Sequence, residues 1–335
     1  MNKRVLITGS AGFIGFHLSR LLLELGYEVL GVDNFNEYYD VGLKRARNNI
    51  LEQYEKYDLL IFDIETHGKL QEVCRQFSPN FIVHLAAQAG VRYSIDNPRA
   101  YFDANLTGTF ELLEAARNCN LKHLLIASTS SAYGANDAYP YAENDKSDWP
   151  MSFYAATKKS TEVLSHSYAH IYGIPITAFR FFTVYGPWGR PDMAFFKFTR
   201  AILEERPIDV YNHGNMKRDF TYVLDLVTAV EKLLNATPQA GLKSCADDSI
   251  SPVAPWRIVN IGNGNPVELS AFIEVIEKKL GTLAIKNLMD IQPGDVPQTF
   301  ADNRLLKKLI GNVPATNIET GMGNFVDWYR DYYEA

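Results

Sequence analysis

Residues 5–15 read Val-Leu-Ile-Thr-Gly-Ser-Ala-Gly-Phe-Ile-Gly, a short apolar run that leads into three glycines spaced G-x-x-G-x-x-G. The run predicts a buried strand that ends at Gly9, and the leucines between residues 18 and 25 recur at helical spacing. Without β-carbons, the glycines of such a strand–loop–helix unit let the backbone approach a pyrophosphate at the positive helix N-terminus. We therefore expect Gly9, Gly12 and Gly15 to hold a dinucleotide.

An acidic residue ends the next predicted strand. The apolar stretch from Glu28 to Val32 is followed directly by Asp33, at about the distance of ~20 residues typical of dinucleotide-binding units. A carboxylate there accepts hydrogen bonds from both ribose hydroxyls and repels a 2′-phosphate, which favours NAD over NADP. The alternative is that the glycines form an ordinary turn and Asp33 caps a loop.

Further apolar runs alternate with helical stretches through the first half of the chain. They lie at Leu59 to Phe62, Phe81 to Leu85, Leu124 to Ala127 and Ile176 to Phe179. This alternation predicts an α/β fold, a doubly wound parallel sheet of the Rossmann type. We assign residues 1–182 to an NAD-binding Rossmann domain, to which a late strand near residues 258–262 returns, and residues 183–335 mainly to a smaller substrate-binding lobe. Residues 237–255 read as a surface loop.

Composition excludes several classes of protein. The 335 residues carry 33 basic and 39 acidic side chains, for a net charge of −6, with no dense basic run, so we expect neither nucleic acid nor a membrane surface as partner. No stretch reaches the ~18 apolar residues of a membrane span, and the three cysteines are far apart in sequence. These features predict a cytoplasmic protein with free thiols.

A tyrosine and a lysine follow the central strands at helical spacing. Tyr154 and Lys158 lie four positions apart, which places phenol and ammonium on one helix face, and positive charge favours ionisation of the phenol. Thr129 follows the strand Leu124 to Ala127, at the carboxyl edge where open α/β sheets bind ligands, and is placed to relay a proton to Tyr154. Taken alone, such a tyrosine–lysine pair is more often a solvated helix face.

Together with His84-Leu85-Ala86-Ala87 and Asn105, these residues resemble the extended short-chain dehydrogenase/reductase family over nearly the whole chain. The segments 33–40, 88–94, 180–193 and 292–295 are most similar to those of nucleotide-sugar 4-epimerases that act on UDP-glucuronate. The resemblance implies a Rossmann fold, bound NAD, a UDP-sugar substrate and interconversion of UDP-glucuronate and UDP-galacturonate through a 4-keto sugar.

The resemblance also implies roles for individual residues. Tyr154 becomes the catalytic base, Lys158 binds the nicotinamide ribose, and Thr129 hydrogen-bonds the sugar hydroxyl and the tyrosine. Phe13, Ile14, Asp63, Ile64 and Ala86 join the cofactor site, whereas Arg92, Phe195, Arg218 and Asp295 join the UDP-sugar site.

Two departures bear on the reaction. Dehydratases of the family carry Asp-Glu after the catalytic threonine, and decarboxylases carry Glu at the second of these positions, whereas this chain has Ser130-Ser131. Serine hydroxyls are too weakly acidic to replace the carboxyl pair, so dehydration is disfavoured. Gln292 stands where galactose epimerases have an arginine, which shifts phosphate binding toward Arg218. UDP-glucose/UDP-galactose epimerisation, UDP-glucuronate decarboxylation and an inactive NAD-sensing module remain alternatives.

Selectivity for an acidic sugar requires groups that hold its carboxylate. Thr183, Ser130, Ser131 and Arg190 are our candidates, because a guanidinium fixes a carboxylate through two parallel bonds. The alternative is that Arg190 pairs with Asp192 and the hydroxyls cap turns. His166 and His170 have metal-compatible spacing but no third ligand, so no metal is expected. Apolar faces on 106–116 and 163–171 favour a homodimer; the alternative is that both stretches cover the sheet.

Overall fold

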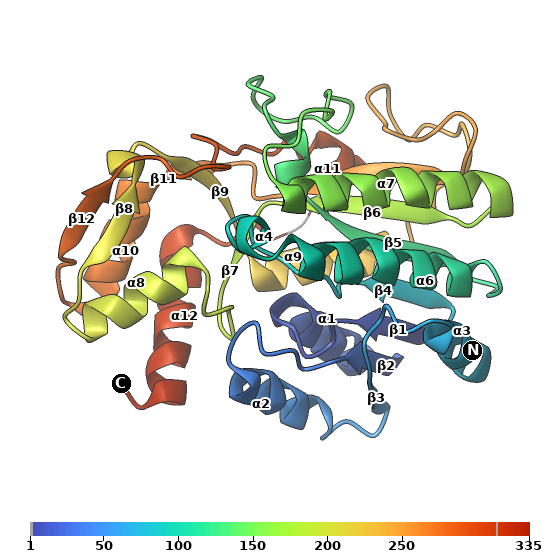
Figure 1. Ribbon diagram of the computed structural model, residues 1–335, viewed down its shortest axis with the longest axis horizontal. Helices are drawn as coiled ribbons and strands as arrows, with labels where there is room; N and C mark the ends of the chain where they lie inside the picture. Colours follow the sequence, from blue (N-terminus) through green and yellow to red (C-terminus); the bar gives the residue numbers. More distant parts are fainter. Residues whose placement is uncertain (1–2, 313) are drawn as a thin grey trace.

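A parallel sheet of seven strands forms the centre of the computed structural model, which describes residues 3–312 and 314–335 (Figure 1). The strands run in the order β10-β6-β5-β4-β1-β2-β3. They are β1 (Arg4–Thr8), β2 (Glu28–Asp33), β3 (Tyr57–Ile61), β4 (Phe81–His84), β5 (His123–Thr129), β6 (Ile176–Phe181) and β10 (Trp256–Ile261). The strand order reverses between β1 and β4, so a crevice opens at the carboxyl ends of these two strands.

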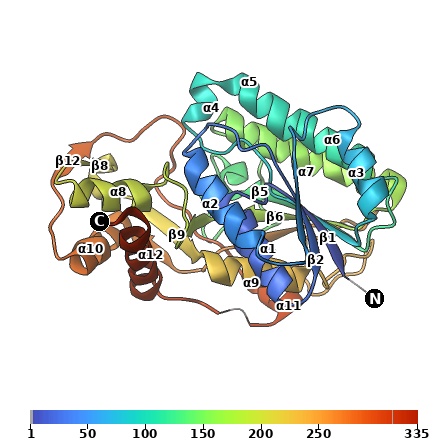
Figure 2. The ribbon, with the colours of Figure 1, turned by 90° about the horizontal axis from the view of Figure 1, so that it is seen from below.

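Helices cover both faces of this sheet (Figure 2). One face carries α3 (Lys69–Phe77), α6 (Gly108–Ala116) and α7 (Phe153–Tyr172), and the other carries α1 (Phe13–Glu24), α9 (Val223–Leu233) and α11 (Arg304–Ile310). The helix α2 (Val41–Leu51) packs beside α1, and the short helices α4 (Tyr93–Asp96) and α5 (Pro98–Tyr101) lead through a π-helical turn, Phe102–Thr107, into α6. The predicted doubly wound α/β fold is confirmed.

A smaller lobe lies beside the carboxyl edge of the sheet, on the left in Figure 1. Its strands are β7 (Thr183–Tyr185), β8 (Ile208–Tyr211), β9 (Lys217–Tyr222), β11 (Pro266–Glu268) and β12 (Lys286–Met289), and its helices are α8 (Ala194–Leu203), α10 (Leu269–Leu280) and α12 (Ile318–Tyr333). The lobe has an aromatic core of its own, in which the rings of Phe220 and Phe272 stack with centroids 4.2 Å apart.

The chain crosses between the two halves more than once. After β7, helix α9 packs against α1, strand β10 pairs in parallel with β6, and α11 packs on β10. Residues after 183 therefore contribute to both halves. The assignment of cofactor binding to residues 1–182 and of substrate binding mainly to 183–335 stays a prediction.

The loop between α9 and β10 has no helix or strand and is anchored on α7. His166 Nε2 pairs with the hydroxyl of Ser251 at 2.9 Å, and His170 Nδ1 pairs with the carbonyl of Val253 at 2.8 Å. The two histidines thus hold a loop. Among the described residues, no group of three or more His, Cys, Asp or Glu side chains is arranged to hold a metal ion.

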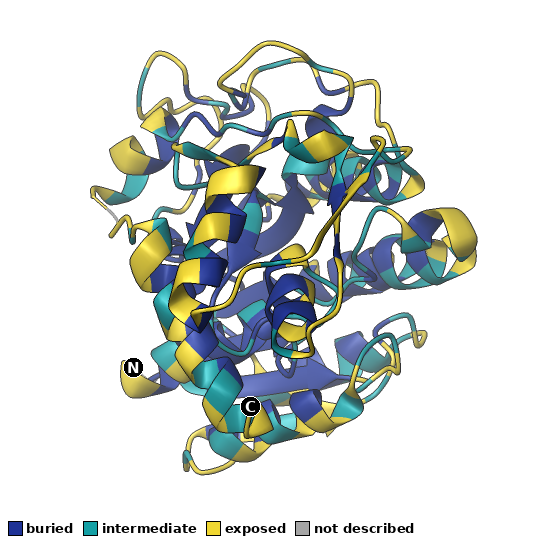
Figure 3. Cartoon of the chain, turned by 90° about the vertical axis from the view of Figure 1, so that its left-hand side faces the viewer, coloured by how far each residue is buried: buried dark blue, intermediate teal, exposed yellow. Residues whose placement is uncertain are grey.

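Burial follows the layers, as Figure 3 shows: the inner strands of the seven-stranded sheet, such as β4 and β5, are buried, and the helices expose their outer faces. Some exposed positions on α6, α7 and the π-helical turn are apolar, namely Phe102, Phe110, Val163 and Ile171. Within the described ranges, no helix is long and apolar enough to span a bilayer.

Candidate functional site

A cavity of about 1120 Å³ lies between the carboxyl edge of the sheet and the smaller lobe. Its wall is formed by the segments that follow β1, β2, β4, β5 and β6 on one side and by α8, β8 and β9 on the other. This position is where open α/β sheets bind their ligands.

The glycine loop forms one end of the cavity and requires its glycines. Gly9 has φ of +76°, and a β-carbon there would lie 2.7 Å from the backbone nitrogen of Ala86. A β-carbon on Gly15 would collide with the carbonyl oxygen of Gly9. Helix α1 begins at Phe13 with Gly12 as its N-cap and no capping side chain, which leaves first-turn N–H groups for an anionic ligand. Phe13 and Ile14 line the cavity beside these glycines.

Asp33 connects this loop to the end of β2. Its Oδ2 accepts a hydrogen bond from the Ala11 N–H at 3.0 Å, and its Oδ1 accepts one from the Phe35 N–H at 2.9 Å. The buried carboxylate therefore has a fixed direction at the cavity wall. The residues fit an adenosine ribose, whose hydroxyls would donate to the same oxygens.

Two buried basic residues of α2, Arg47 and Lys44, were not predicted from the sequence as site residues. The fully buried Arg47 donates to the carbonyl oxygens of Ala11 at 3.0 Å and of Trp188 at 2.6 Å, and so joins the loop to the segment after β7. Lys44 lines the cavity, and burial lowers its pKa to about 8, although the nearby Asp33 carboxylate acts in the opposite direction.

Only some of the residues predicted to contact adenine line the cavity. Ile64 and Ala86 line the cavity. Asp63 is not on the cavity wall, because its exposed carboxylate instead accepts a hydrogen bond from the Asn34 side-chain amide at 2.8 Å.

Tyr154, Lys158 and Thr129 come together on the opposite wall. Tyr154 lies in the first turn of α7, which Ser152 caps by accepting a hydrogen bond from the Ala155 N–H at 3.1 Å. Thr129 is the last residue of β5, and its oxygen accepts a hydrogen bond from the Ser131 N–H at 3.2 Å. All three predicted catalytic residues line the cavity.

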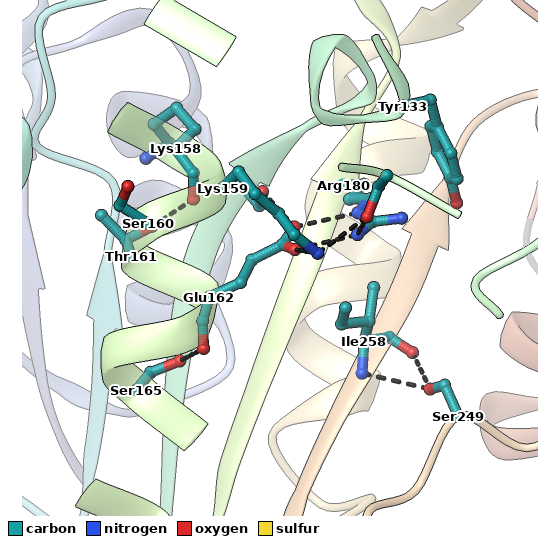
Figure 4. A network of polar contacts seen from close by, with 12 residues as sticks. Tyr133, Lys158, Lys159, Ser160, Thr161, Glu162, Ser165, Arg180, Ser249 and Ile258 are labelled. Atoms are coloured by element: carbon teal, nitrogen blue, oxygen red, sulfur yellow. Dashed lines mark hydrogen bonds and ion pairs between the residues drawn. The ribbon is translucent and has the colours of Figure 1, made fainter. Parts of the chain in front are cut away.

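Burial and neighbouring charges shift the pKa values of Tyr154 and Lys158. Burial raises the pKa of the Tyr154 phenol, while its contact with Thr129 and the positive charge of Arg190 act against that shift. Burial lowers the pKa of Lys158 to about 8, and the charge of Glu162 partly offsets the effect. In Figure 4 the Glu162 carboxylate points toward Arg180 and Lys159, away from the Lys158 ammonium.

Arg190 forms a two-point ion pair at the reacting end of the cavity. Its Nε donates to Oδ1 of Asp192 at 3.0 Å, and its Nη2 donates to Oδ2 at 2.6 Å. The pairing that the sequence left as an alternative is therefore present, and Arg190 also lines the cavity together with Ser130, Ser131 and Thr183.

Of the residues predicted to contact the UDP moiety, Arg92, Arg218 and Asp295 line the cavity and Phe195 does not. Arg92 donates to the Asp295 carboxylate at 3.2 Å and lies 4.2 Å from the ring centroid of Tyr211, so these side chains connect the two halves. Arg218 lines the cavity, and burial lowers its pKa. Phe195 does not line the cavity, because its ring is buried against Phe325, with centroids 4.8 Å apart.

The comparisons with known proteins agree with this geometry. The family model described as "NAD dependent epimerase/dehydratase family" matches residues 5–243. The chain belongs to this family.

Two relatives of this epimerase/dehydratase are similar along nearly the whole chain. A probable UDP-glucuronate 4-epimerase from Rhizobium meliloti is 50% identical over 333 residues, which cover 98% of each chain. UDP-glucuronate 4-epimerase 4 from Arabidopsis thaliana is 44% identical, over 98% of this chain and 76% of its own. A crystal structure of UDP-glucuronic acid 4-epimerase from Bacillus cereus, in complex with UDP-glucuronic acid and NAD, superposes with a TM-score of 0.86 at 32% identity, over 98% of this chain and 100% of its own.

Within this epimerase/dehydratase, the cavity brings together residues that are far apart in sequence. Tyr38, which follows β2, donates a hydrogen bond to the Asp192 carboxylate at 3.3 Å, and Tyr211 on β8 stacks with Arg92. The sequence did not predict either tyrosine as a site residue. Their roles depend on contacts across the cavity, for which neither spacing nor composition gives a signal.

Proposed function

We propose that the protein is an NAD-dependent isomerase that inverts C4 of UDP-glucuronate to give UDP-galacturonate. The observation that carries the proposal is the convergence of Tyr154, Lys158 and Thr129 on the cavity that the glycine loop also lines. The relatives named as UDP-glucuronate 4-epimerases support the same substrate.

Gly9, Gly12, Gly15 and Asp33 would hold NAD, which would supply a reversible hydride acceptor for C4 of the sugar. Tyr154 takes the proton of the C4 hydroxyl, and Thr129 orients that hydroxyl and the phenol. Lys158 binds the nicotinamide ribose and supplies positive charge that favours the ionised phenol. The Asp33 carboxylate repels a 2′-phosphate and so selects against NADP.

The absence of an acid at the two positions after Thr129 separates this proposal from dehydration. Ser130 and Ser131 line the cavity where dehydratases have a carboxyl pair. Serine hydroxyl groups donate hydrogen bonds but are too weakly acidic to replace that carboxyl pair as acid and base at neutral pH. The bound sugar therefore keeps its substituents while C4 is oxidised and reduced.

A 4-keto glucuronate is a β-keto acid, so the enzyme must prevent loss of carbon dioxide. We assign this task to Arg190, Thr183, Ser130 and Ser131, which line one part of the cavity. Asp192 engages the Nε–H and one Nη2–H of Arg190, and Nη2 also lies 3.9 Å from the sulfur of Met193, which leaves the two Nη1 hydrogens for a substrate carboxylate. Holding that carboxylate near the plane of the ketone slows its departure.

The remaining substrate contacts belong to the same proposal. Arg218 neutralises the diphosphate, and Arg92 and Asp295 hold the uridine end after their mutual ion pair rearranges. Asp63 and Phe195 do not line the cavity, so this proposal gives neither of them a role.

We further propose a homodimer that buries the exposed apolar residues of α6 and α7, including Phe110 and Val163. A cytoplasmic location is supported by the three cysteines, all of which are free thiols.

Incubation of the purified protein with UDP-glucuronate tests the activity. A product of unchanged mass that is the C4 epimer supports the proposal, whereas loss of carbon dioxide indicates a decarboxylase. Turnover of UDP-glucose but not of UDP-glucuronate indicates the neutral-sugar epimerase. If the protein retains NAD but turns over no UDP-sugar, the result supports the alternative that it is an inactive NAD-binding module.

A further inference from the structure

We propose that Tyr38 and Asp192 act as a positioning pair that fixes the guanidinium of Arg190 at the reacting end of the cavity. This inference rests on the proposed epimerase function and adds residues to which no role has yet been given. The pair acts through Arg190 and determines how the sugar carboxylate is held while C4 is a ketone.

The three side chains come from two separate segments and meet on the cavity wall. Tyr38 lies between β2 and α2, whereas Arg190 and Asp192 lie between β7 and α8. The Asp192 carboxylate accepts two hydrogen bonds from Arg190, at 3.0 and 2.6 Å, and one from the Tyr38 hydroxyl, at 3.3 Å. The two-point bond fixes the plane of the guanidinium, and the hydroxyl fixes the carboxylate.

The hydroxyl of Tyr38 is itself held in place. Its ring packs against Tyr93 with centroids 5.0 Å apart, and Gly90, with φ of +108°, leaves space for it. A β-carbon on Gly90 would lie 2.7 Å from the Tyr38 oxygen. Burial raises the pKa of Tyr38 to about 12, so the phenol stays protonated and donates over the whole working range of pH.

Asp192 is ionised, as it must be to accept hydrogen bonds from both Arg190 and Tyr38. Burial alone would raise the pKa of its carboxyl, but the charge and hydrogen bonds of Arg190 lower the pKa below its usual value. Asp192 therefore remains a carboxylate at neutral pH. Its negative charge also offsets part of the positive charge that Arg190 presents to the substrate and to Tyr154.

Fixing the guanidinium has a consequence for selectivity. A mobile Arg190 would bind the sugar carboxylate at several rotations, including the perpendicular one in which the carbon–carbon bond breaks and its electron pair enters the ketone. Carbon dioxide then leaves, and a proton later adds to the carbon that held it. With Arg190 fixed by Asp192, each N–H bond that remains for the substrate has a fixed direction.

The test compares Tyr38→Phe and Asp192→Asn with a matched pair on the surface. Tyr54 donates to the Glu24 carboxylate at 3.2 Å, and Glu24 accepts from Arg20 at 2.9 Å, so Tyr54→Phe and Glu24→Gln make the same chemical changes away from the cavity. Each holoenzyme is assayed with UDP-glucuronate for kcat, KM and the ratio of UDP-pentose to UDP-galacturonate, and its NAD content is measured.

We expect Tyr38→Phe to lower kcat by about three- to tenfold, the worth of one hydrogen bond, and Asp192→Asn to lower it further. Both variants should release more UDP-pentose than the wild type does while they retain NAD. The surface variants should stay within about twofold of the wild type in every readout, because exposed pairs contribute little.

The pH profile separates positioning from a merely structural role. Asp192→Asn leaves the charge of Arg190 uncompensated near Tyr154, so the acidic limb of kcat should shift down by on the order of 0.5 to 1 pH unit. Tyr38→Phe removes no charge and should leave that limb in place. The other charged or titratable groups that face this cluster are Tyr39, Lys44, Tyr93, Tyr101, Tyr154 and Lys197, and all of them are unchanged in both variants.

Equal kcat, KM and product ratio in Tyr38→Phe and Tyr54→Phe would overturn the inference. So would an Asp192→Asn enzyme that folds, binds NAD and makes no additional UDP-pentose. If Asp192→Asn does not fold, Tyr38→Phe alone decides. If the wild type does not epimerise UDP-glucuronate at all, the proposed function fails, and this outcome is distinct because it needs no variant.

Discussion

The ion pair between Glu162 and Arg180 should contribute strongly to stability, and Glu162→Gln tests its size. Glu162 Oε1 accepts from Arg180 Nε at 2.9 Å and from the Ser128 hydroxyl at 2.6 Å, and Oε2 accepts from Arg180 Nη2 at 2.8 Å (Figure 4). Both side chains are 1% exposed. The pair joins β5, β6 and α7, and α7 carries Tyr154 and Lys158.

The expected loss in the free energy of unfolding depends on the unpaired Arg180 that the substitution leaves in the core. Glutamine keeps the volume and one acceptor but removes the charge, so the guanidinium of Arg180 stays buried without a counterion. Breaking one partner of a buried pair costs about 3 to 5 kcal/mol. Because the glutamine oxygen still accepts a hydrogen bond from Arg180, we expect a loss near the lower end of this range, about 3 kcal/mol.

Urea unfolding of the holoenzyme at neutral pH, at fixed NAD, measures this loss. The control is Glu24→Gln, which breaks an exposed pair with Arg20 and should cost about 0 to 1 kcal/mol. Glu162 has a lowered pKa in the folded protein because Arg180 overcomes the effect of burial. Its stabilisation is therefore complete above the pKa of an unfolded Glu and is lost as the pH falls through the folded value, so the difference between wild type and variant should shrink in acid. Equal unfolding midpoints for Glu162→Gln and Glu24→Gln at neutral pH would refute the reasoning.

Three further predictions concern the reaction. Tyr154→Phe should retain NAD and lower kcat by at least the 10²–10⁴-fold typical of general acid–base catalysis, whereas a nearly wild-type rate would remove Tyr154 from the mechanism. Asp33→Asn should lose bound NAD during purification, as measured in the supernatant of the denatured protein, and retention of NADP by the wild type would contradict the role of Asp33. Because the pKa of Lys158 is about 8, its ammonium is lost as the pH rises through that value, so kcat should fall on the alkaline side; a constant kcat up to pH ~10 would contradict a role for this charge.

The sequence predicted those parts of the fold and site that local patterns determine. The glycine spacing, the apolar runs and the four-residue separation of Tyr154 and Lys158 follow from strand and helix periodicity, and the predicted fold class and family are confirmed. The return of α9 and α11 to the sheet was not predicted, because an amphipathic helix packs equally well on either half.

The predicted site residues that do not line the cavity lie where one position on an element decides what a side chain contacts. Phe195 faces the core of the lobe, whereas Phe196, next on the same helix, lines the cavity. Asp63 turns outward toward Asn34. Arg47 and Tyr38 were missed because their partners, Trp188 and Asp192, lie far along the chain and become neighbours only in the folded protein.

The central claim is that C4 of UDP-glucuronate loses and regains its own hydrogen while Tyr154 handles only the hydroxyl proton. UDP-glucuronate that carries deuterium at C4 tests this claim most directly, with the UDP-galacturonate product isolated and its C4 hydrogen read by NMR and mass spectrometry. The account predicts that the product keeps the deuterium at C4 and, in a second reaction in D₂O with unlabelled substrate, gains none there. Washout of the label, or entry of solvent deuterium at C4, would contradict it.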